Sequence, residues 1–305
     1  MIKKGILFFI LASIFISSCK TDVEEKRRNT GFQKNKKEVA SKKDTVTEHP
    51  VYYRFPSAKE MFSYLQGKDL RYQTDLTNPV ANLEKYHSTR SKTLNLGVYL
   101  ADISYMTLFD KTQNIDRYFN AVFNLSADLR IKAPHEERLL QKISDNMHNA
   151  DSLVEIADRY HSDIIDYLLK TGNEKTLAVI TTGSYIEGLY LASNLVSDYT
   201  KNEPTVNKIA DQKHAFINLT KFARDFSEDI NTRYSIKYLE KINKHFENLT
   251  VIEDDTNIER ENDSTMVFGG GDKIDISQSD FNALKKEVTT IRNEIVTNSK
   301  IAENE

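Results

Sequence analysis

The middle of the chain contains the segment Asn95-Leu96-Gly97-Val98-Tyr99-Leu100-Ala101-Asp102-Ile103-Ser104-Tyr105. It lies within residues 91–112, which are apolar on most faces of a helix. Residues 175–199 have the same character and contain Gly183-Ser184-Tyr185-Ile186-Glu187-Gly188-Leu189-Tyr190. A helix that is apolar on all sides is expected to be buried. The two segments are therefore predicted to be the central helices of the fold.

On both sides of these segments, apolar residues recur at helical spacing, with capping and breaking residues between the runs. No stretch alternates as a strand would. We predict an all-α fold, an irregular multi-helix bundle with long apolar central helices, occupying residues 51–253. Further helices are expected at 57–66, after Asn78-Pro79, and at 115–129, 135–149, 152–169, 204–228 and 232–248. The helix at 152–169 is expected to be capped by Asp151 or Ser152 and to end at Gly172.

The end of the chain predicts a separate amphipathic helix within residues 277–305. Residues 254–276 are acidic, polar and rich in glycine, which is typical of a flexible connection. Ser277 then resembles a helix cap. A narrow apolar stripe follows it at spacings of three and four: Phe281, Leu284, Val288, Ile291 and Ile295. The stripe is expected to pack on the bundle; the alternative is a protein partner that docks on this helix.

The N-terminus is typical of a secreted and lipidated protein. Lys3 and Lys4 precede an apolar run at residues 5–16, which is too short to cross a bilayer. Ile16-Ser17-Ser18-Cys19 resembles the lipobox of bacterial lipoproteins, and Cys19 is the only cysteine. The resemblance implies that residues 1–18 are a signal peptide and that acylated Cys19 anchors the protein in a membrane.

Residues 19–50 are expected to be a disordered tether, because they are highly charged and nearly free of large apolar residues. Lys20-Thr21-Asp22-Val23-Glu24-Glu25 resembles an export signal of Bacteroidota lipoproteins. It implies an outer membrane lipoprotein that is either periplasmic or surface-exposed. Asp44-Thr45-Val46 resembles an O-glycosylation acceptor, with Thr45 as the modified residue.

Residues 51–305 contain 31 Lys and Arg against 39 Asp and Glu, a net charge of −8. Nucleic-acid binding depends on neutralising phosphate charges. This acidic balance therefore argues against a general nucleic-acid binder.

Each central helix contains one carboxylate that the apolar pattern does not explain, Asp102 in the first and Glu187 in the second. A buried carboxylate must be paired, hydrogen-bonded or turned toward a cavity. One interpretation is that Asp102 and Glu187 line a ligand pocket together with Tyr105, Tyr185 and Tyr190. The other is that the carboxylates belong to a buried network that fixes the register of the helices.

The chain offers no convincing metal or cofactor site. Glu84-Lys85-Tyr86-His87 and Asp211-Gln212-Lys213-His214 superficially resemble half-sites of di-iron carboxylate bundles, but their order and their positions do not fit. The sequence contains no Gly-x-Ser-x-Gly, Walker or His-Glu-x-x-His motif. We predict no metal and no cofactor, and an enzyme is the less favoured alternative.

Three segments together resemble an uncharacterised family of all-helical Bacteroidota lipoproteins: residues 95–105, Glu187-Gly188-Leu189-Tyr190-Leu191-Ala192, and Ile291-Arg292-Asn293-Glu294-Ile295-Val296. The resemblance implies the helical fold and the envelope location, and it carries no known activity. The resulting expectation is a membrane-anchored binding or scaffolding protein. The alternative is a small-ligand binder or enzyme that uses a pocket around Asp102 and Glu187.

Overall fold

A computed structural model describes residues 61–62, 70–132, 136–252, 260–262, 265–266 and 273–298. Residues 1–50 form one unit and residues 51–305 form another, and all described residues belong to the second unit. The predictions for the signal peptide, Cys19, the tether and Thr45 therefore lie outside the described residues. Of the helix predicted at residues 57–66, only Met61 and Phe62 are described, and both are helical and buried.

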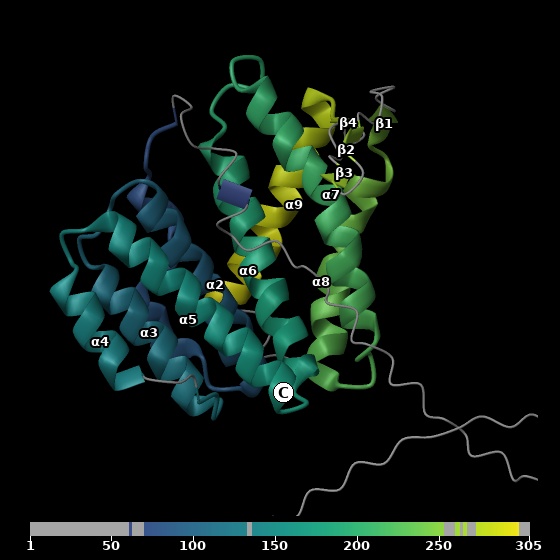
Figure 1. The fold of residues 1–305 in the computed structure, drawn as a ribbon. Coiled ribbons are helices and arrows are strands. Elements are labelled where there is room, and N and C mark those ends of the chain that lie inside the picture. The colour runs from purple at the N-terminus through teal and green to yellow at the C-terminus, as the bar shows by residue number, and fades with distance from the viewer. Residues whose placement is uncertain are drawn as a thin grey trace, which may run out of the picture. The chain divides into compact units, whose positions relative to one another are not determined.

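The described part of residues 51–305 is an all-α bundle, as predicted (Figure 1). Its helices are η1 (Thr74–Leu76), η2 (Val80–Lys85), α2 (Thr89–Leu108), α3 (Ile115–Asp128), α4 (Glu136–Asp145), α5 (Ala150–Lys170), α6 (Glu174–Leu195), α7 (Glu203–Arg224), α8 (Ile230–Glu247) and α9 (Gln278–Thr297). The short helix expected after Asn78-Pro79 is the 3-10 helix η2.

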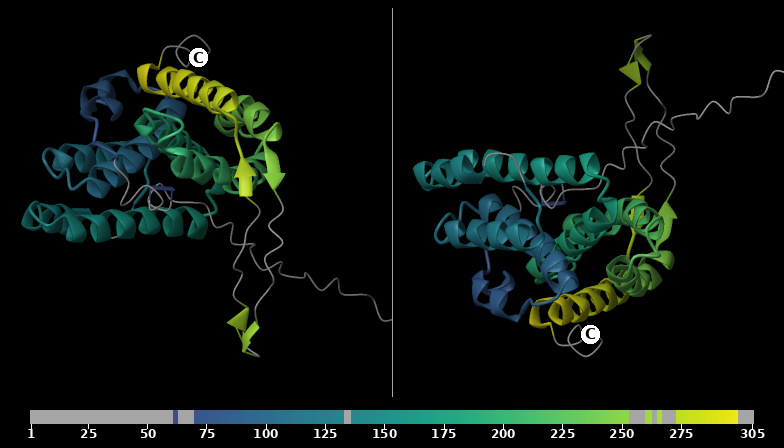
Figure 2. Two further views of the ribbon diagram at one scale, coloured as in Figure 1. Left: turned by 90° about the horizontal axis from the view of Figure 1, so that it is seen from above. Right: turned by 90° about the horizontal axis from the view of Figure 1, so that it is seen from below.

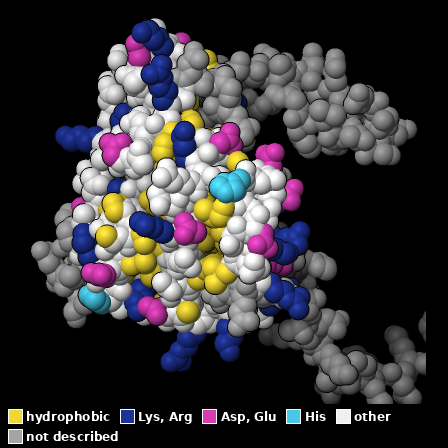
Figure 3. Space-filling view, turned by 90° about the vertical axis from the view of Figure 1, so that its left-hand side faces the viewer, with side chains coloured by type: hydrophobic (Ala, Val, Ile, Leu, Met, Phe, Trp, Pro, Cys, Tyr) yellow, Lys and Arg dark blue, Asp and Glu magenta, His cyan; other side chains and the backbone are white. Residues whose placement is uncertain are grey.

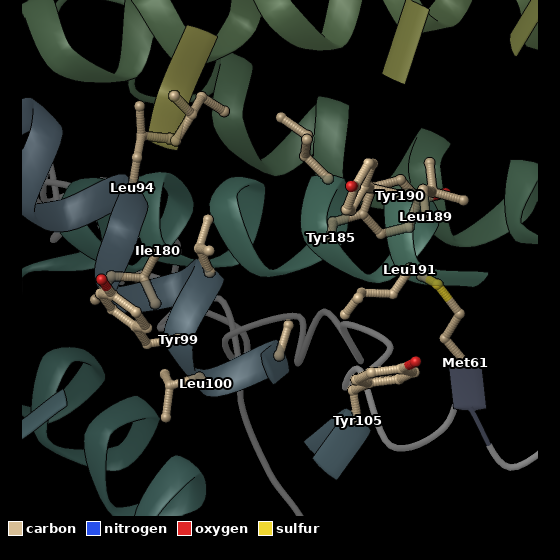
Figure 4. Packing of buried hydrophobic residues seen from close by; sticks show 14 of the residues in the cluster. Met61, Leu94, Tyr99, Leu100, Tyr105, Ile180, Tyr185, Leu189, Tyr190 and Leu191 are labelled. Carbon is tan, nitrogen blue, oxygen red and sulfur yellow. The ribbon is translucent and has the colours of Figure 1, made fainter. Parts of the chain in front are cut away.

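Helices α2 and α6 form the centre of the bundle and pack mainly against each other. Figure 4 shows side chains of the core around them, including Leu94 and Tyr99 on α2 and Ile180 on α6. Two glycines allow the close approach. A Cβ atom at Gly97 would lie 2.0 Å from the carbonyl oxygen of Ile180, and one at Gly183 would lie 2.1 Å from that of Leu94. The backbones touch where neither helix has a side chain.

The central position of these helices was predicted correctly, but their description as long apolar helices was wrong. Their buried residues include many polar ones, among them Thr93, Asn95 and Asp102 on α2 and Thr182 and Glu187 on α6. Among the described residues, none of the helices combines the length and the apolar character that a membrane span requires. Both helices are buried on nearly every face because other helices surround them.

The surrounding helices are amphipathic, as their spacing predicts. On α5 the buried residues recur every three or four positions: Leu153, Ile156, Tyr160, Ile164 and Leu168. Gly172 ends this helix with φ of +65°, and the N–H of Asn173 donates to the carbonyl of Leu168 at 2.8 Å, which confirms the predicted C-cap. The predicted N-cap was wrong, because Asn149, rather than Asp151 or Ser152, accepts the capping hydrogen bond.

The C-terminal helix α9 is part of the bundle, so its predicted separation is not observed. Ser277 caps it by accepting a hydrogen bond from the N–H of Asp280, as expected. It packs against α6 and α8 and also contacts α2 (Figure 2). Its whole apolar stripe is buried: Phe281, Leu284, Val288, Ile291 and Ile295. The interpretation that this stripe packs on the bundle is confirmed.

Short strands also occur, which the sequence pattern did not predict. Strand β1 (Thr250–Ile252) pairs antiparallel with β4 (Lys273–Asp275), and β2 (Arg260–Asn262) pairs with β3 (Thr265–Met266). Strand β4 lies in the segment predicted as a flexible connection, and Ile274 within it is buried. The pair of β1 and β4 therefore ties the start of α9 to the end of α8. Strands of two or three residues are too short for an alternating pattern to reveal them.

Candidate functional site

Glu187 on α6 forms a buried ion pair with Arg292 on α9. Nε of Arg292 lies 2.9 Å from Oε2 of Glu187, and its Nη2 lies 2.9 Å from Oε1. The two side chains are 0% and 7% exposed. Nη2 also donates to the carbonyl oxygen of Leu76 at 2.8 Å. This bidentate geometry is the strongest form of an Arg–carboxylate contact, and it connects α6 with α9 through two residues that lie 105 positions apart in the chain.

Asp102 on α2 is fully buried beside this ion pair. Its Oδ2 accepts a hydrogen bond from the backbone N–H of Asn78 at 3.1 Å. Its Oδ1 has no hydrogen-bond partner among the described residues. Burial and the neighbouring charge of Glu187 raise the pKa of Asp102 well above its ordinary value, although Arg292 and the Asn78 N–H act in the opposite direction. The environment thus favours a neutral carboxyl group.

Arg292 stays charged although it is buried. Burial disfavours the charge of the guanidinium, but the charge and hydrogen bonds of Glu187 raise its pKa overall. The ring of Tyr190 adds a cation–π contact, with its centroid 4.4 Å from Cζ of Arg292. Arg292 therefore remains a cation in the core.

Buried polar side chains next to this cluster hold the last turn of α9. The hydroxyl of Tyr86 donates to the carbonyl of Val296 at 2.9 Å, and the amide of Asn95 donates to that of Ile295 at 3.2 Å. Asn78 donates to both Tyr86 and Asn95. Carbonyl groups at a helix end have no partner within the helix. These side chains therefore supply hydrogen bonds to two carbonyl groups at the end of α9.

The structure brings together only part of the predicted pocket lining. Tyr190 joins Asp102 and Glu187 through its contact with Arg292. Tyr105 instead binds the backbone of Gln73, accepting from its N–H at 2.9 Å. The hydroxyl of Tyr185 donates to the carbonyl of Gln212 on α7 at 2.9 Å, and its ring packs on Phe216, so Tyr185 belongs to a different part of the core.

The cluster has no opening to solvent in the described part of the chain. As whole residues, Asp102 and Glu187 are 0% exposed and Arg292 is 5% exposed. A small pocket does occur between α2, α3, α5 and α6, lined by residues that include Leu100, Ser104, Phe119, Asp158 and His161, but neither carboxylate lines it. Burial lowers the pKa of His161 there. Of the two interpretations of the carboxylates, the buried network is the one that the geometry favours.

The two half-sites of the rejected di-iron pattern lie on different helices. Glu84 lies on η2, and Asp211 on α7 forms an ion pair with Lys208 at 3.1 Å. Among the described residues, no three side chains of His, Cys, Asp or Glu are placed to share a metal ion.

Comparison with protein-family models, with curated proteins and with solved structures gives no match to this chain. The resemblance to helical Bacteroidota lipoproteins therefore stays a prediction. The function of the chain has to be inferred from its own residues.

Sequence reasoning missed the residues that complete the cluster, above all Arg292. One signal was present: Arg292 directly follows Ile291 and stands four residues after Val288, so it borders the apolar stripe of α9. A cation beside a buried stripe is the natural partner for an unexplained carboxylate elsewhere in the core. Asn78 and Asn95 gave no such signal, because their roles depend on which polar groups the fold places beside them.

Proposed function

We propose that the chain is an outer membrane lipoprotein, anchored by acylated Cys19, whose helical body binds or scaffolds a protein partner without catalysing a reaction. The supporting observation is the burial of Asp102, Glu187 and Arg292. Asp102 and Glu187 are the charged groups of the predicted ligand pocket, and both make their hydrogen bonds inside the core, Glu187 with Arg292. Their burial favours the binding or scaffolding function over the alternative of an enzyme or ligand binder built around Asp102 and Glu187.

The surface of the body is where a partner would bind. Figure 3 shows hydrophobic side chains between charged ones on the face that lies at the left in Figure 1, where α3 and α4 are. The large apolar residues that are exposed in the described part of the chain lie on four helices: Leu140, Leu169, Ile217 and Ile230. The apolar stripe of α9 is buried, so a partner would use another surface of the body.

An affinity pull-down from the cell's own membranes tests this function. The acylated protein is expected to recover a specific partner, and the Cys19→Ala variant is expected to recover less of it, because the variant is no longer held at the membrane. A Leu140→Glu variant with intact Cys19 tests the exposed face separately. Recovery of no specific partner by the acylated protein would count against a scaffold.

Location is tested separately, by protease treatment of intact cells. Cleavage of the helical body would place it on the cell surface, and protection until the outer membrane is permeabilised would place it in the periplasm. Fractionation of the protein away from the outer membrane would contradict the proposed location.

A further inference from the structure

The buried cluster holds two carboxyl groups and one guanidinium. Arg292 makes its side-chain hydrogen bonds to Glu187 and to the carbonyl of Leu76, and none of the described hydrogen bonds joins it to Asp102. If both acids were ionised, this sealed part of the core would carry an uncompensated negative charge. Such a charge is costly in a medium of low polarity, and the group changes its protonation state instead.

The unpartnered oxygen of Asp102 points to where the extra proton lies. Oδ1 is buried and has no donor within the described residues, whereas Oδ2 already accepts from the Asn78 N–H. Asp102 lies beside the Glu187–Arg292 pair, because Asp102 accepts from the N–H of Asn78 and Arg292 donates to the carbonyl of Leu76, two residues earlier in the chain. Two ionised carboxylates only accept hydrogen bonds, but a protonated one donates. A proton on Oδ1 therefore removes both the orphan acceptor and the excess charge.

We propose that Asp102 and Glu187 hold one proton between them, carried by Asp102 on Oδ1 and donated to Glu187, and that this proton is a pH-sensitive latch on helix α9. Glu187 keeps its negative charge and pairs with Arg292, so the cluster is neutral in total. The proton enters from water on folding and returns to water when Asp102 ionises. Its loss leaves two carboxylates facing one guanidinium, which weakens the contact that joins α9 to α2 and α6.

The other titratable groups around Asp102 do not change this charge balance. They are tyrosines: Tyr72, Tyr86, Tyr99, Tyr105, Tyr118 and Tyr190. Burial raises the pKa of each, to about 12 for Tyr86 and Tyr118, so all stay neutral through the range in which carboxyl groups titrate. Besides Glu187 and Arg292, the nearby charged group on η1 is Asp75, which is exposed to solvent.

The proton shared by Asp102 and Glu187 makes the fold more stable at low pH. In the unfolded chain Asp102 ionises near its ordinary pKa of 3.8, whereas in the folded chain it keeps its proton to a higher pH. The stabilisation is therefore fully present below the unfolded pKa and is lost as pH rises toward the folded pKa. Within this window, one group changes the unfolding equilibrium constant by about tenfold per pH unit.

Amide substitutions distinguish the role of Asp102, which carries the proton, from that of Glu187, which carries the charge. In the full-length Cys19→Ala chain, which carries no acyl groups, urea unfolding is measured at about pH 5, 7 and 9 for the parent, Asp102→Asn and Glu187→Gln. The Asn amide copies a protonated Asp102, because it accepts from the Asn78 N–H and donates to Glu187. The free energy of unfolding of Asp102→Asn is expected to equal or exceed that of the parent at high pH. Its pH profile is expected to lack the contribution that the ionisation of Asp102 makes in the parent. Glu187→Gln leaves Arg292 buried without its counter-charge and is expected to raise the unfolding equilibrium constant roughly 100- to 1,000-fold.

The exposed Asp75→Asn is the matched control and should leave the pH profile of the parent unchanged. Infrared difference spectra of the parent against Asp102→Asn give a second readout, the C=O stretch of a protonated carboxyl group at neutral pH. If Glu187→Gln fails to fold while Asp102→Asn folds, the result supports the proposal, because Glu187→Gln is expected to be much the more destabilising substitution. Three results would overturn the proposal. They are an equal loss of stability in Asp102→Asn and Glu187→Gln, parallel pH profiles for the parent and Asp102→Asn, and the absence of a protonated-carboxyl band.

Discussion

Single residues decide how close the two central helices come. At Gly97 and Gly183 the backbones of α2 and α6 are in contact, and the space for a Cβ atom is taken by a carbonyl oxygen of the other helix. A backbone carbonyl cannot rotate away as a side chain can. Any added methyl group must therefore push the two helices apart along their whole contact.

Gly97→Ala is accordingly expected to destabilise the fold by more than about 3 kcal/mol, because overpacking forces backbone shifts. Gly172→Ala is the control, since nothing lies within 4 Å of a Cβ there and only its φ of +65° is unfavourable. That strain costs about 1–2 kcal/mol. Urea unfolding measures the free energy of unfolding of both variants. If Gly97→Ala lowers it no more than Gly172→Ala does, the close packing of α2 on α6 at Gly97 would be contradicted.

At the same scale, the sequence identified Asp102 and Glu187 but not their surroundings. Both stood out because a carboxylate interrupts an apolar helix, and that signal is local. Their partner Arg292 lies 105 positions after Glu187, and the Asn78 N–H that binds Asp102 is a backbone group. A local sequence pattern cannot predict a contact with a residue so distant in the chain or with a backbone group.

At the scale of elements, α9 is the clearest case of a structure completed by tertiary contacts. Its stripe faces α6 and α8, and its last carbonyl groups are bound by Tyr86 and Asn95. An amphipathic stripe predicts that a helix has a partner, but it does not say whether the partner is the same chain. Here the same chain supplies it.

Leu284→Ala is expected to lower the free energy of unfolding by about 2–5 kcal/mol, because Leu284 is fully buried in the bundle. Lys286→Ala, on the exposed side of the same helix, is expected to change it by less than about 0.5 kcal/mol. Thermal unfolding followed by circular dichroism compares the two. Similar values for both variants would mean that α9 does not pack on the bundle in solution.

For the whole molecule, the acidic body and the proposed lipidation of Cys19 lead to one physical expectation about membranes. Residues 51–305 carry a net charge of −8. Such a body is repelled by anionic lipid surfaces, so under the proposed function the acyl chains on Cys19 are expected to supply the attachment.

The acylated protein is therefore expected to sediment with phospholipid vesicles and to enter the detergent phase on phase separation. The Cys19→Ala variant is expected to remain in the aqueous phase in both assays. A Ser18→Ala variant, which keeps the cysteine, should behave like the parent. Stable vesicle binding by Cys19→Ala would show that another part of the chain holds the membrane, and the anchoring proposal would fail.

The sequence by itself determined the all-α class, the central position of α2 and α6, the caps at Gly172 and Ser277, and the two acids that the core has to accommodate. These features follow from periodicity and from the conformational preferences of single residues, which act over a few positions of the chain. Only the tertiary structure decided that Asp102 and Glu187 meet in a sealed core, that Arg292 pairs with Glu187, and that Tyr185 lies elsewhere. The physical reason is that desolvation and charge pairing depend on which distant segments surround a group, and that is settled only when the helices pack.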